Sequence, residues 1–175
     1  YKLNSILPND IVIKKITQVI DSAHARFDAI SRSYEYRIFL GRNPFLIDTT
    51  WQINNQKLNI VKMNEAAEIL LTYTNFKCFS RVKSNVKTYN CDVKRAAWIQ
   101  TDKILTFHIT ADRFLRNMVR AIVGTLLEVG SEKINLEDFK KIIESKNRCK
   151  AGTSALAKGL FLTQVTYPNI IFIHE

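Results

Sequence analysis

The sequence predicts an α+β fold in which helices pack on one side of a mostly antiparallel sheet. Residues 33–40 and 104–110 alternate apolar and polar side chains, which is the period of a strand. Residues 63–71 instead place apolar side chains at i, i+3, i+4, i+7 and i+8, the spacing of one helix face: Met63, Ala66, Ala67, Leu70 and Leu71. Strands and helices do not alternate strictly along the chain, which argues against a parallel βαβ sheet.

Proline, glycine and capping residues mark where the expected helices and strands begin and end. Pro8 stops a helix, the break at Gly41 ends a strand, and Pro168 closes the last strand. Asp112 is the type of residue that caps a helix start, and Gly130 the type that follows a helix end. In chain order we expect the end of a helix over 1–7, β-structure over 11–20, a strand over 33–40, an ambiguous segment over 51–59, a helix over 63–71, hairpin strands over 95–100 and 104–110, a helix after Asp112, a short helix over 136–145 and a strand over 160–165.

Composition limits the class of protein. The 175 residues suit one large domain or two small ones, and 26 Lys and Arg against 16 Asp and Glu give a net charge of +10. Such a charge favours a polyanion as partner, because each phosphate contact releases counterions. The sequence has no run of about 18 apolar residues, so we expect no membrane span.

The three cysteines, Cys78, Cys91 and Cys149, are widely separated and form no C-x-x-C pair. We therefore expect no zinc site and no other metal. An odd number of cysteines without a disulfide framework is typical of a reducing compartment, so we expect a cytoplasmic protein.

Residues 77–95 form a segment of their own character, with six basic residues and one acidic residue, Asp92. Phe79 and Tyr89 are interleaved with the positive charges, as in proteins that follow a nucleic-acid backbone and stack on its bases. A solvated basic loop explains the charge equally, and Phe79 with Phe76 is also a candidate for the core.

Four stretches in one order resemble the TruA-type tRNA pseudouridine synthases. Residues 24–36 are similar to the family's H-A-R-F-x-A…R-x-Y-x-Y signature, and residues 114–124 to its F-x-x-x-M-V-R-x-I-V-G. Residues 157–168 are similar to its closing A-x-G-L-x-L-x-x-V-x-Y-P, and residues 3–11 to the stretch before the first motif. Each motif alone is weak, but together they span nearly the whole chain.

The resemblance implies a pseudouridine-synthase-like fold and an enzyme without a cofactor. It implies a homodimer that isomerises uridine to pseudouridine in the anticodon arm of tRNA, at positions 38 to 40. The family's catalytic aspartate belongs to an R-T-D-x-G-V-H-A motif, and no such motif occurs here. We therefore expect a C-terminal fragment that is inactive alone, with 1–30 as the remnant of the N-terminal half and connecting strand and 31–175 as the C-terminal synthase domain.

The resemblance assigns two catalytic roles within the chain. Tyr34 matches the tyrosine that packs on the target base, although a core tyrosine is the alternative and Tyr36 shares its strand face. Arg120 matches the arginine that pairs with the catalytic aspartate, since a close guanidinium favours an ionised carboxylate. Without the motif, Arg120 would be assigned to a solvated basic helix face.

Further residues are expected to bind the RNA. Arg116 lies four residues before Arg120 on the same predicted helix face, with Arg113 a turn earlier, and Arg116 is expected to contact phosphate. Lys83 and Lys87 belong to the basic segment. Leu160, with Leu162, matches a leucine that packs near the family's active site, and core packing explains both equally well.

Asp28 and His24 are the misleading candidates. Asp28 is a carboxylate close in sequence to Arg26 and Tyr34, but it occupies a position where the family accepts other small residues, so we expect a structural role. His24 has no visible nucleophile beside it and is expected to be a hydrogen-bonded structural group.

Two other functions remain compatible with the sequence. A non-catalytic RNA-binding module, or a degenerate paralogue, would keep the charge and lack the aspartate. A basic protein-interaction domain would show RNA affinity that is absent or insensitive to salt, whereas phosphate contacts weaken as salt rises.

Overall fold

The computed structural model describes residues 2–54, 57–82 and 86–173. It divides the chain into two compact units, one made of residues 1–29 with 167–175 and the other of Ile30–Thr166. The assignment of residues 1–30 to the remnant of an N-terminal half stays a prediction.

The smaller unit contains little regular structure. Its helical turns are η1 (Lys2–Ser5) and η7 (Asn169–Ile171), both 3-10. The expected β-structure over 11–20 is wrong, because among the described residues this stretch forms only a single bridge, from Val19 to Phe172. Aliphatic residues form a strand only beside another strand, and here Ile13 pairs instead with the side chain of Asn4.

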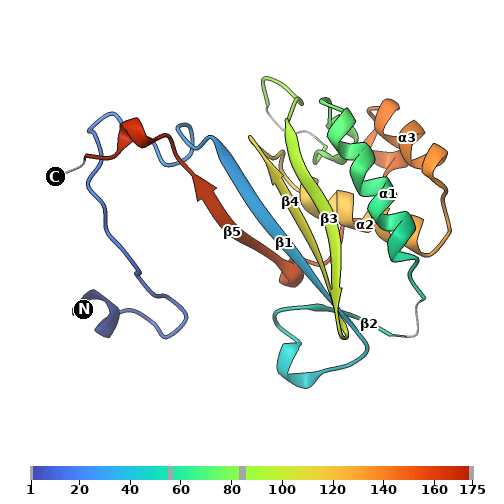
Figure 1. Ribbon diagram of the computed structural model, residues 1–175, viewed down its shortest axis with the longest axis horizontal. Coiled ribbons are helices and arrows are strands. Elements are labelled where there is room, and N and C mark those ends of the chain that lie inside the picture. The colour runs from blue at the N-terminus through green and yellow to red at the C-terminus, as the bar shows by residue number, and fades with distance from the viewer. Residues whose placement is uncertain (1, 55–56, 83–85, 174–175) are drawn as a thin grey trace. The chain divides into compact units, whose positions relative to one another are not determined.

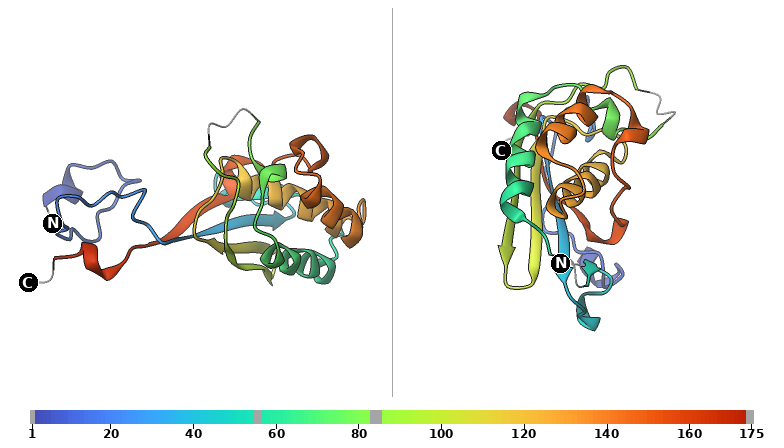
Figure 2. Two further views of the ribbon diagram at one scale, coloured as in Figure 1. Left: turned by 90° about the horizontal axis from the view of Figure 1, so that it is seen from above. Right: turned by 90° about the vertical axis from the view of Figure 1, so that its right-hand side faces the viewer.

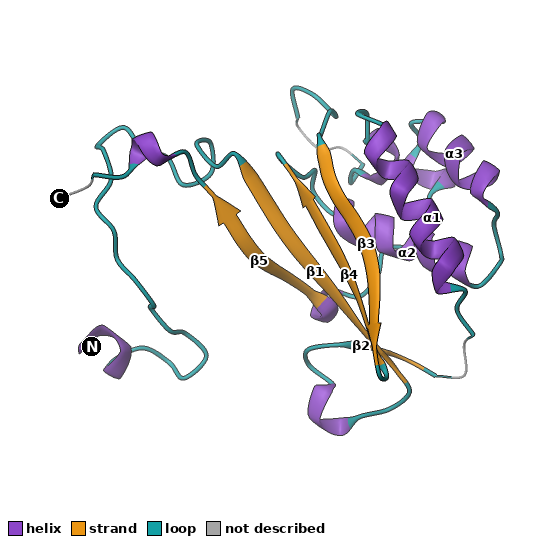
Figure 3. Ribbon diagram, in the orientation of Figure 1, coloured by secondary structure: helices purple, strands orange, loops and turns teal. Residues whose placement is uncertain are grey.

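The larger unit is built on a five-stranded sheet with β1 (Ser31–Leu40) in the middle, as Figures 1 and 3 show. On one side β1 pairs antiparallel with β4 (Ile104–Ala111), which pairs antiparallel with β3 (Val93–Thr101). On the other side, the first part of β1 pairs antiparallel with β5 (Leu160–Thr166), and its last residues pair parallel with the short β2 (Trp51–Ile53).

Alternation decides which side chains of β1 enter the core. Tyr36 and Ile38 are fully buried, while Glu35 and Arg37 lie on the opposite face and pair with each other at 2.9 Å. Gly41 ends the strand with φ of 131°, a conformation that a residue with a side chain rarely adopts. The strand expected over 33–40 and its break are confirmed.

The expected hairpin is also confirmed, with β3 and β4 in register from Thr101 opposite Ile104. Asp102 takes the left-handed conformation, with φ of 53°, that a tight turn between twisted strands requires. The strand expected over 160–165 is β5.

Three α-helices pack alongside the sheet, near the β3–β4 hairpin (Figures 1 and 2), which confirms the α+β class. α1 (Ile60–Ile69) begins at Asn59, whose side chain accepts from the amide of Lys62. α3 (Leu136–Glu144) begins at a reciprocal cap between Asn135 and Asp138. The remaining 3-10 turns are η2 (Pro44–Leu46), η3 (Leu70–Thr72), η4 (Lys77–Phe79), η5 (Arg148–Lys150) and η6 (Ala157–Gly159).

The predicted start of the third helix is wrong. α2 runs over Met118–Gly130 and follows Asn117, which has φ of 70°. Asp112 does not cap it, because its carboxylate accepts from the amides of Asp92 and Arg113 and so closes the loop after β4. Gly130 is the last helical residue and not the residue after it.

Burial of apolar side chains from sheet and helices forms one core. The largest fully buried side chains are Tyr36, Phe76, Phe79, Phe107, Phe139, Ile38, Met63, Leu70, Leu105, Ile109, Met118 and Ile122. Gly130 permits close packing of two helices here, because a Cβ at this position would overlap Met63 of α1. Within the described ranges, no helix is long and apolar enough to cross a membrane.

The side chain of Asn64 in α1 forms hydrogen bonds with the backbone of β3, at the outer edge of the sheet. Its side-chain amide donates to the carbonyl of Trp98 at 3.1 Å and its oxygen accepts from the amide of Trp98 at 2.7 Å. Asn64 therefore takes the place of a neighbouring strand beside β3 and links α1 to it.

Replacing Asn64 by Leu should leave the Trp98 amide and carbonyl without partners, at a cost of about 2 kcal/mol in the free energy of unfolding. Urea denaturation followed by circular dichroism measures this. The Glu65→Gln control, an exposed neighbour on α1, should stay within about 0.5 kcal/mol of the wild type. Equal stability of the two variants would show that the hydrogen bonds of Asn64 to Trp98 do not stabilise the fold.

Candidate active site

The two tyrosines of β1 face the same side of the sheet but have different environments. Tyr36 is fully buried, and its hydroxyl donates to the carbonyl of Leu156 at 2.7 Å. Tyr34 is half-buried and meets the ring of Phe114 edge to face, with ring centres 5.1 Å apart and planes at 85°. Tyr34 therefore lies at the margin of the core beside an aromatic neighbour and is only partly buried.

Arg120 lies in the first turn of α2 and is half-buried. Its Nε donates to the carbonyl of Ala155 at 2.6 Å, and the amide of Ala155 donates back to the carbonyl of Arg120 at 2.9 Å. In the described part of the chain, its two terminal nitrogens make no hydrogen bond or ion pair. The guanidinium is thus anchored on one edge and keeps its other donors for a further partner.

Residues 151–156, which we call the 151–156 segment, lie against α2. The amide of Gly152 donates to the hydroxyl of Thr125 at 3.0 Å. A Cβ at Gly124 would overlap the carbonyl oxygen of Thr153, so a glycine is needed for this approach. We did not predict this role of Gly124 from the sequence; the signal for it was the run of small residues from Ala151 to Ala155.

The register of β5 places its two leucines differently. Leu162 lies opposite Tyr34, and Leu160 lies opposite Tyr36. Leu160 is half-buried against the core, whereas Leu162 is 52% exposed. The leucine directly beside Tyr34 is therefore Leu162. Leu160 lies beside the buried Tyr36 and packs against the core.

The electrostatics of this region keep Tyr36 neutral. Burial raises the pKa of the Tyr36 phenol far above its usual range, and the positive charge of Arg120 opposes part of that rise. Tyr36 is therefore a permanent hydrogen-bond donor to Leu156 at neutral pH. Tyr36 and Arg120 donate to consecutive carbonyls, those of Leu156 and Ala155.

The basic residues are only partly brought together. Arg113 and Arg116 precede α2 and do not lie on its face, which corrects the prediction of a shared helix face with Arg120. The amide of Arg81 donates to the carbonyl of Arg116 at 3.0 Å, so the basic loop reaches the start of α2. Lys87 is exposed, and Lys83 lies outside the described residues.

The aromatic residues of the basic loop are not a continuous stacking surface. Phe76 and Phe79 are fully buried in the core, which corrects the interpretation of Phe79 as a base-stacking residue. Tyr89 is half-buried, with the ammonium of Lys77 5.4 Å from its ring centre.

Asp28 and His24 close a turn. The carboxylate of Asp28 accepts from the amide of His24 at 2.7 Å, and the His24 imidazole accepts from the amides of Arg26 and Phe27. Both side chains are used locally, as in the capping of a turn.

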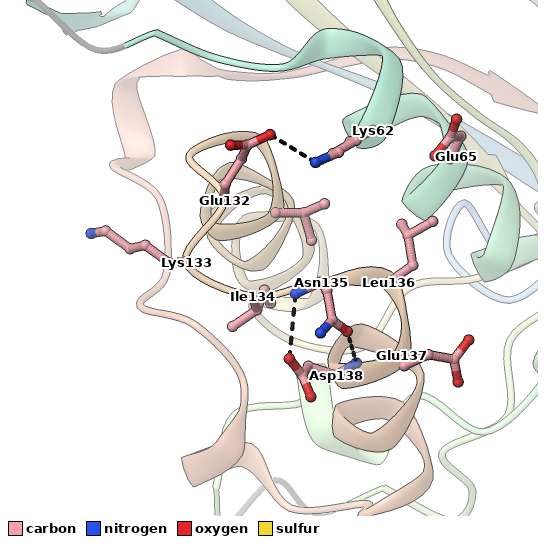
Figure 4. A pocket seen from close by; sticks show the side chains of 10 residues that line it. Lys62, Glu65, Glu132, Lys133, Ile134, Asn135, Leu136, Glu137 and Asp138 are labelled. Carbon is pink, nitrogen blue, oxygen red and sulfur yellow. Dashed lines mark hydrogen bonds and ion pairs between the residues drawn. The ribbon is translucent and has the colours of Figure 1, made fainter.

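A cavity of about 580 Å³ lies between α1, the end of α2 and the start of α3, and none of the predicted site residues lines it (Figure 4). Lys62 and Glu132 pair across it at 2.7 Å, and Asn135 and Asp138 cap each other, so these polar groups hold one another. Over the part of the chain that the structure covers, no three His, Cys, Asp or Glu residues are grouped as metal ligands would be.

Comparisons with known proteins agree on one family. The family model described as tRNA pseudouridine synthase matches residues 66–168. Proteins named tRNA pseudouridine synthase A from Parabacteroides distasonis and Bacteroides fragilis are 48% and 52% identical, and each match covers 98% of this chain and 68% of the relative. The protein of the same name from Acetivibrio thermocellus is 40% identical over 95% of this chain and 69% of its own length.

Replacing Tyr36 by Phe should lower the free energy of unfolding by about 1 kcal/mol at pH 7, because the Leu156 carbonyl loses its donor. The folded state holds the Tyr36 proton more tightly than the unfolded state, whose pKa is about 10. Wild-type stability should therefore begin to fall once the pH exceeds about 10, and the Phe variant should lack that part of the fall.

Urea unfolding at several pH values from 7 to 10.5 measures the difference between the two proteins. It should shrink toward alkaline pH. Tyr89→Phe is the control, because the Tyr89 hydroxyl makes no hydrogen bond to any described residue. A difference that stays constant with pH would mean that the Tyr36 phenol titrates normally in the folded state.

Proposed function

This chain belongs to the tRNA pseudouridine synthase family, whose members are isomerases, and we propose that the protein carrying it converts uridine to pseudouridine in the anticodon arm of tRNA, at positions 38 to 40. We further propose that the catalytic aspartate lies outside these 175 residues, so that the chain alone is inactive. The geometry of Arg120 is the observation that carries this proposal.

The reaction breaks the bond between uracil N1 and ribose C1′ and forms a bond between C5 and C1′. The base must turn between these steps, and the proton leaving C5 is balanced by one gained at N1. The enzyme therefore needs a carboxylate, a group that keeps the carboxylate ionised and a surface that retains the free base. The target nucleotide must also leave its stack.

Arg120 fits the second requirement. A guanidinium binds a carboxylate through two parallel N–H···O bonds, and this favours the ionised form. Ala155 fixes the Nε edge, and the terminal nitrogens have no partner among the described residues. No carboxylate of the described chain pairs with Arg120, which supports a partner from another part of the protein.

Tyr34 fits the third requirement. An aromatic face retains a base by stacking, worth about 1–3 kcal/mol, without fixing its rotation. Phe114 supports the Tyr34 ring from the edge, and Leu162 lies opposite it in the neighbouring strand. We propose that the target uracil stacks on Tyr34 and that Leu160 packs beneath this surface.

The charge distribution supports tRNA as the substrate. The net charge is +10, and the contact of Arg81 with Arg116 brings the basic loop to the start of the helix that carries Arg120. We propose that Arg113, Arg116, Lys83 and Lys87 contact the RNA backbone. Binding should then weaken as salt rises.

We also propose that the protein works as a cytoplasmic homodimer. All three cysteines are free thiols, which fits a reducing compartment. Burial raises the pKa of Cys78 to about 12 and that of Cys91 to about 11, so neither buried thiol is a reactive thiolate near neutral pH.

Pseudouridine formation on unmodified tRNA by the full-length protein tests the proposal, with the modified positions mapped by chemical sequencing. The wild type should modify positions 38 to 40. Arg120→Met should lower kcat about 100-fold or more, because the electrostatic partner of the carboxylate is lost. The exposed Lys133→Met, which also removes one positive charge, should be fully active.

The 175-residue chain alone should form no product. Product from this chain would make Asp28 the leading candidate for the nucleophile and contradict the proposed site. Full-length protein that binds tRNA without turnover would identify a non-catalytic RNA-binding relative.

A further inference from the structure

We propose that Arg148 is a positioning residue for Arg120, and that it acts by holding the 151–156 segment in place. This inference rests on the proposed function, since it assumes that Arg120 pairs with the catalytic carboxylate. Arg148 itself is not expected to touch substrate.

The Arg148 guanidinium donates hydrogen bonds to three acceptors of the 151–156 segment. Its Nη1 donates to the carbonyls of Ala151 and Gly152, both at 3.1 Å, and its Nη2 donates to the hydroxyl of Ser154 at 2.8 Å. A guanidinium can do this because its donors lie in one rigid plane. The segment therefore bends around Arg148 before it reaches Ala155.

A second side chain holds the same hydroxyl from the side of α2. Asn117, the residue before the helix, donates to Ser154 at 2.6 Å and does not cap the helix. Its φ of 70° is a conformation that asparagine tolerates better than most residues. Ser154 thus links Arg148 to the start of α2, within one turn of Arg120.

Ala155, the next residue of the segment, connects Ser154 to Arg120. Ala155 exchanges hydrogen bonds with Arg120 in both directions, and the following carbonyl, of Leu156, accepts from Tyr36. A displaced Ser154 would move the Ala155 carbonyl and so rotate the guanidinium. Because catalytic geometry tolerates little misplacement, a shift of about 1 Å can cost about 100-fold in rate.

Two other roles for Arg148 make different predictions. A phosphate-binding Arg148 would affect tRNA affinity and leave kcat unchanged. A merely stabilising Arg148 would affect the melting temperature and leave kcat unchanged in protein that remains folded. A positioning residue should instead lower kcat with little effect on KM.

Steady-state kinetics of the full-length protein separates these roles. Arg148→Met should lower kcat about 10- to 100-fold, with KM for tRNA within about threefold of the wild type. Arg148→Lys should lose most of the same activity, because a single ammonium cannot span three acceptors. Lys150→Met is the control and should be unaffected, because the Lys150 side chain is exposed and makes no hydrogen bond or ion pair with a described residue.

Ser154→Ala provides a milder variant should Arg148→Met not fold. It removes the hydroxyl shared by Arg148 and Asn117, and it should lower kcat about 3- to 10-fold with KM unchanged. Ser154→Thr keeps the hydroxyl and should recover most of the lost rate. Unchanged kcat in both Arg148→Met and Ser154→Ala, or a rise in KM alone, would overturn the proposal.

Amide hydrogen exchange gives a readout that does not need catalysis. In Arg148→Met the amide of Ala155 should exchange at least about tenfold faster, because its bond to Arg120 opens more often. If the wild type forms no pseudouridine but Ala155 still exchanges faster in Arg148→Met, the proposed function is contradicted and the positioning by Arg148 stands. Unchanged exchange at Ala155 would contradict the positioning, whatever the activity.

Discussion

The candidate site depends on the pair of hydrogen bonds that joins Arg120 to Ala155. These bonds tie the first turn of α2 to the 151–156 segment and set the direction of the guanidinium at the same time. From Leu156 the chain continues through η6 into β5, whose register with β1 places Leu162 beside Tyr34. This pair of hydrogen bonds therefore connects the Arg120 guanidinium to the strand that lies beside the Tyr34 ring, although the two residues are far apart in the sequence.

The pattern of apolar and polar residues predicted the strands correctly where the apolar residues are the ones buried in the core. The strand β1 and the β3–β4 hairpin alternate in sequence because one face of each strand enters the core. The failures share a physical cause, which is that the decisive contact is not local. Residues 11–20 have the composition of a strand without an adjacent strand, and Asp112 has the chemistry of a helix cap but is used by the backbone of Asp92.

The sequence singled out the residues of the proposed site but not the contacts between them. Tyr34 and Tyr36 share a face of β1 and look equivalent in sequence. They differ only in the folded chain, where Tyr36 is buried and donates to the Leu156 carbonyl, whereas Tyr34 lies at the margin of the core. Arg116 was predicted on a helix that in fact starts later. Arg148 carried no signal of its own, because its role depends on three acceptors that only the folded chain brings to it.

We propose that the guanidinium of Arg120 binds a carboxylate from outside these 175 residues. A crystal structure of the full-length protein tests it through the distances from the terminal nitrogens of Arg120 to the nearest carboxylate. We expect two contacts of about 2.7–2.9 Å to one aspartate from outside this chain, with the Nε still bonded to Ala155. Pairing of Arg120 with Asp28, or with any other carboxylate of this chain, would contradict it.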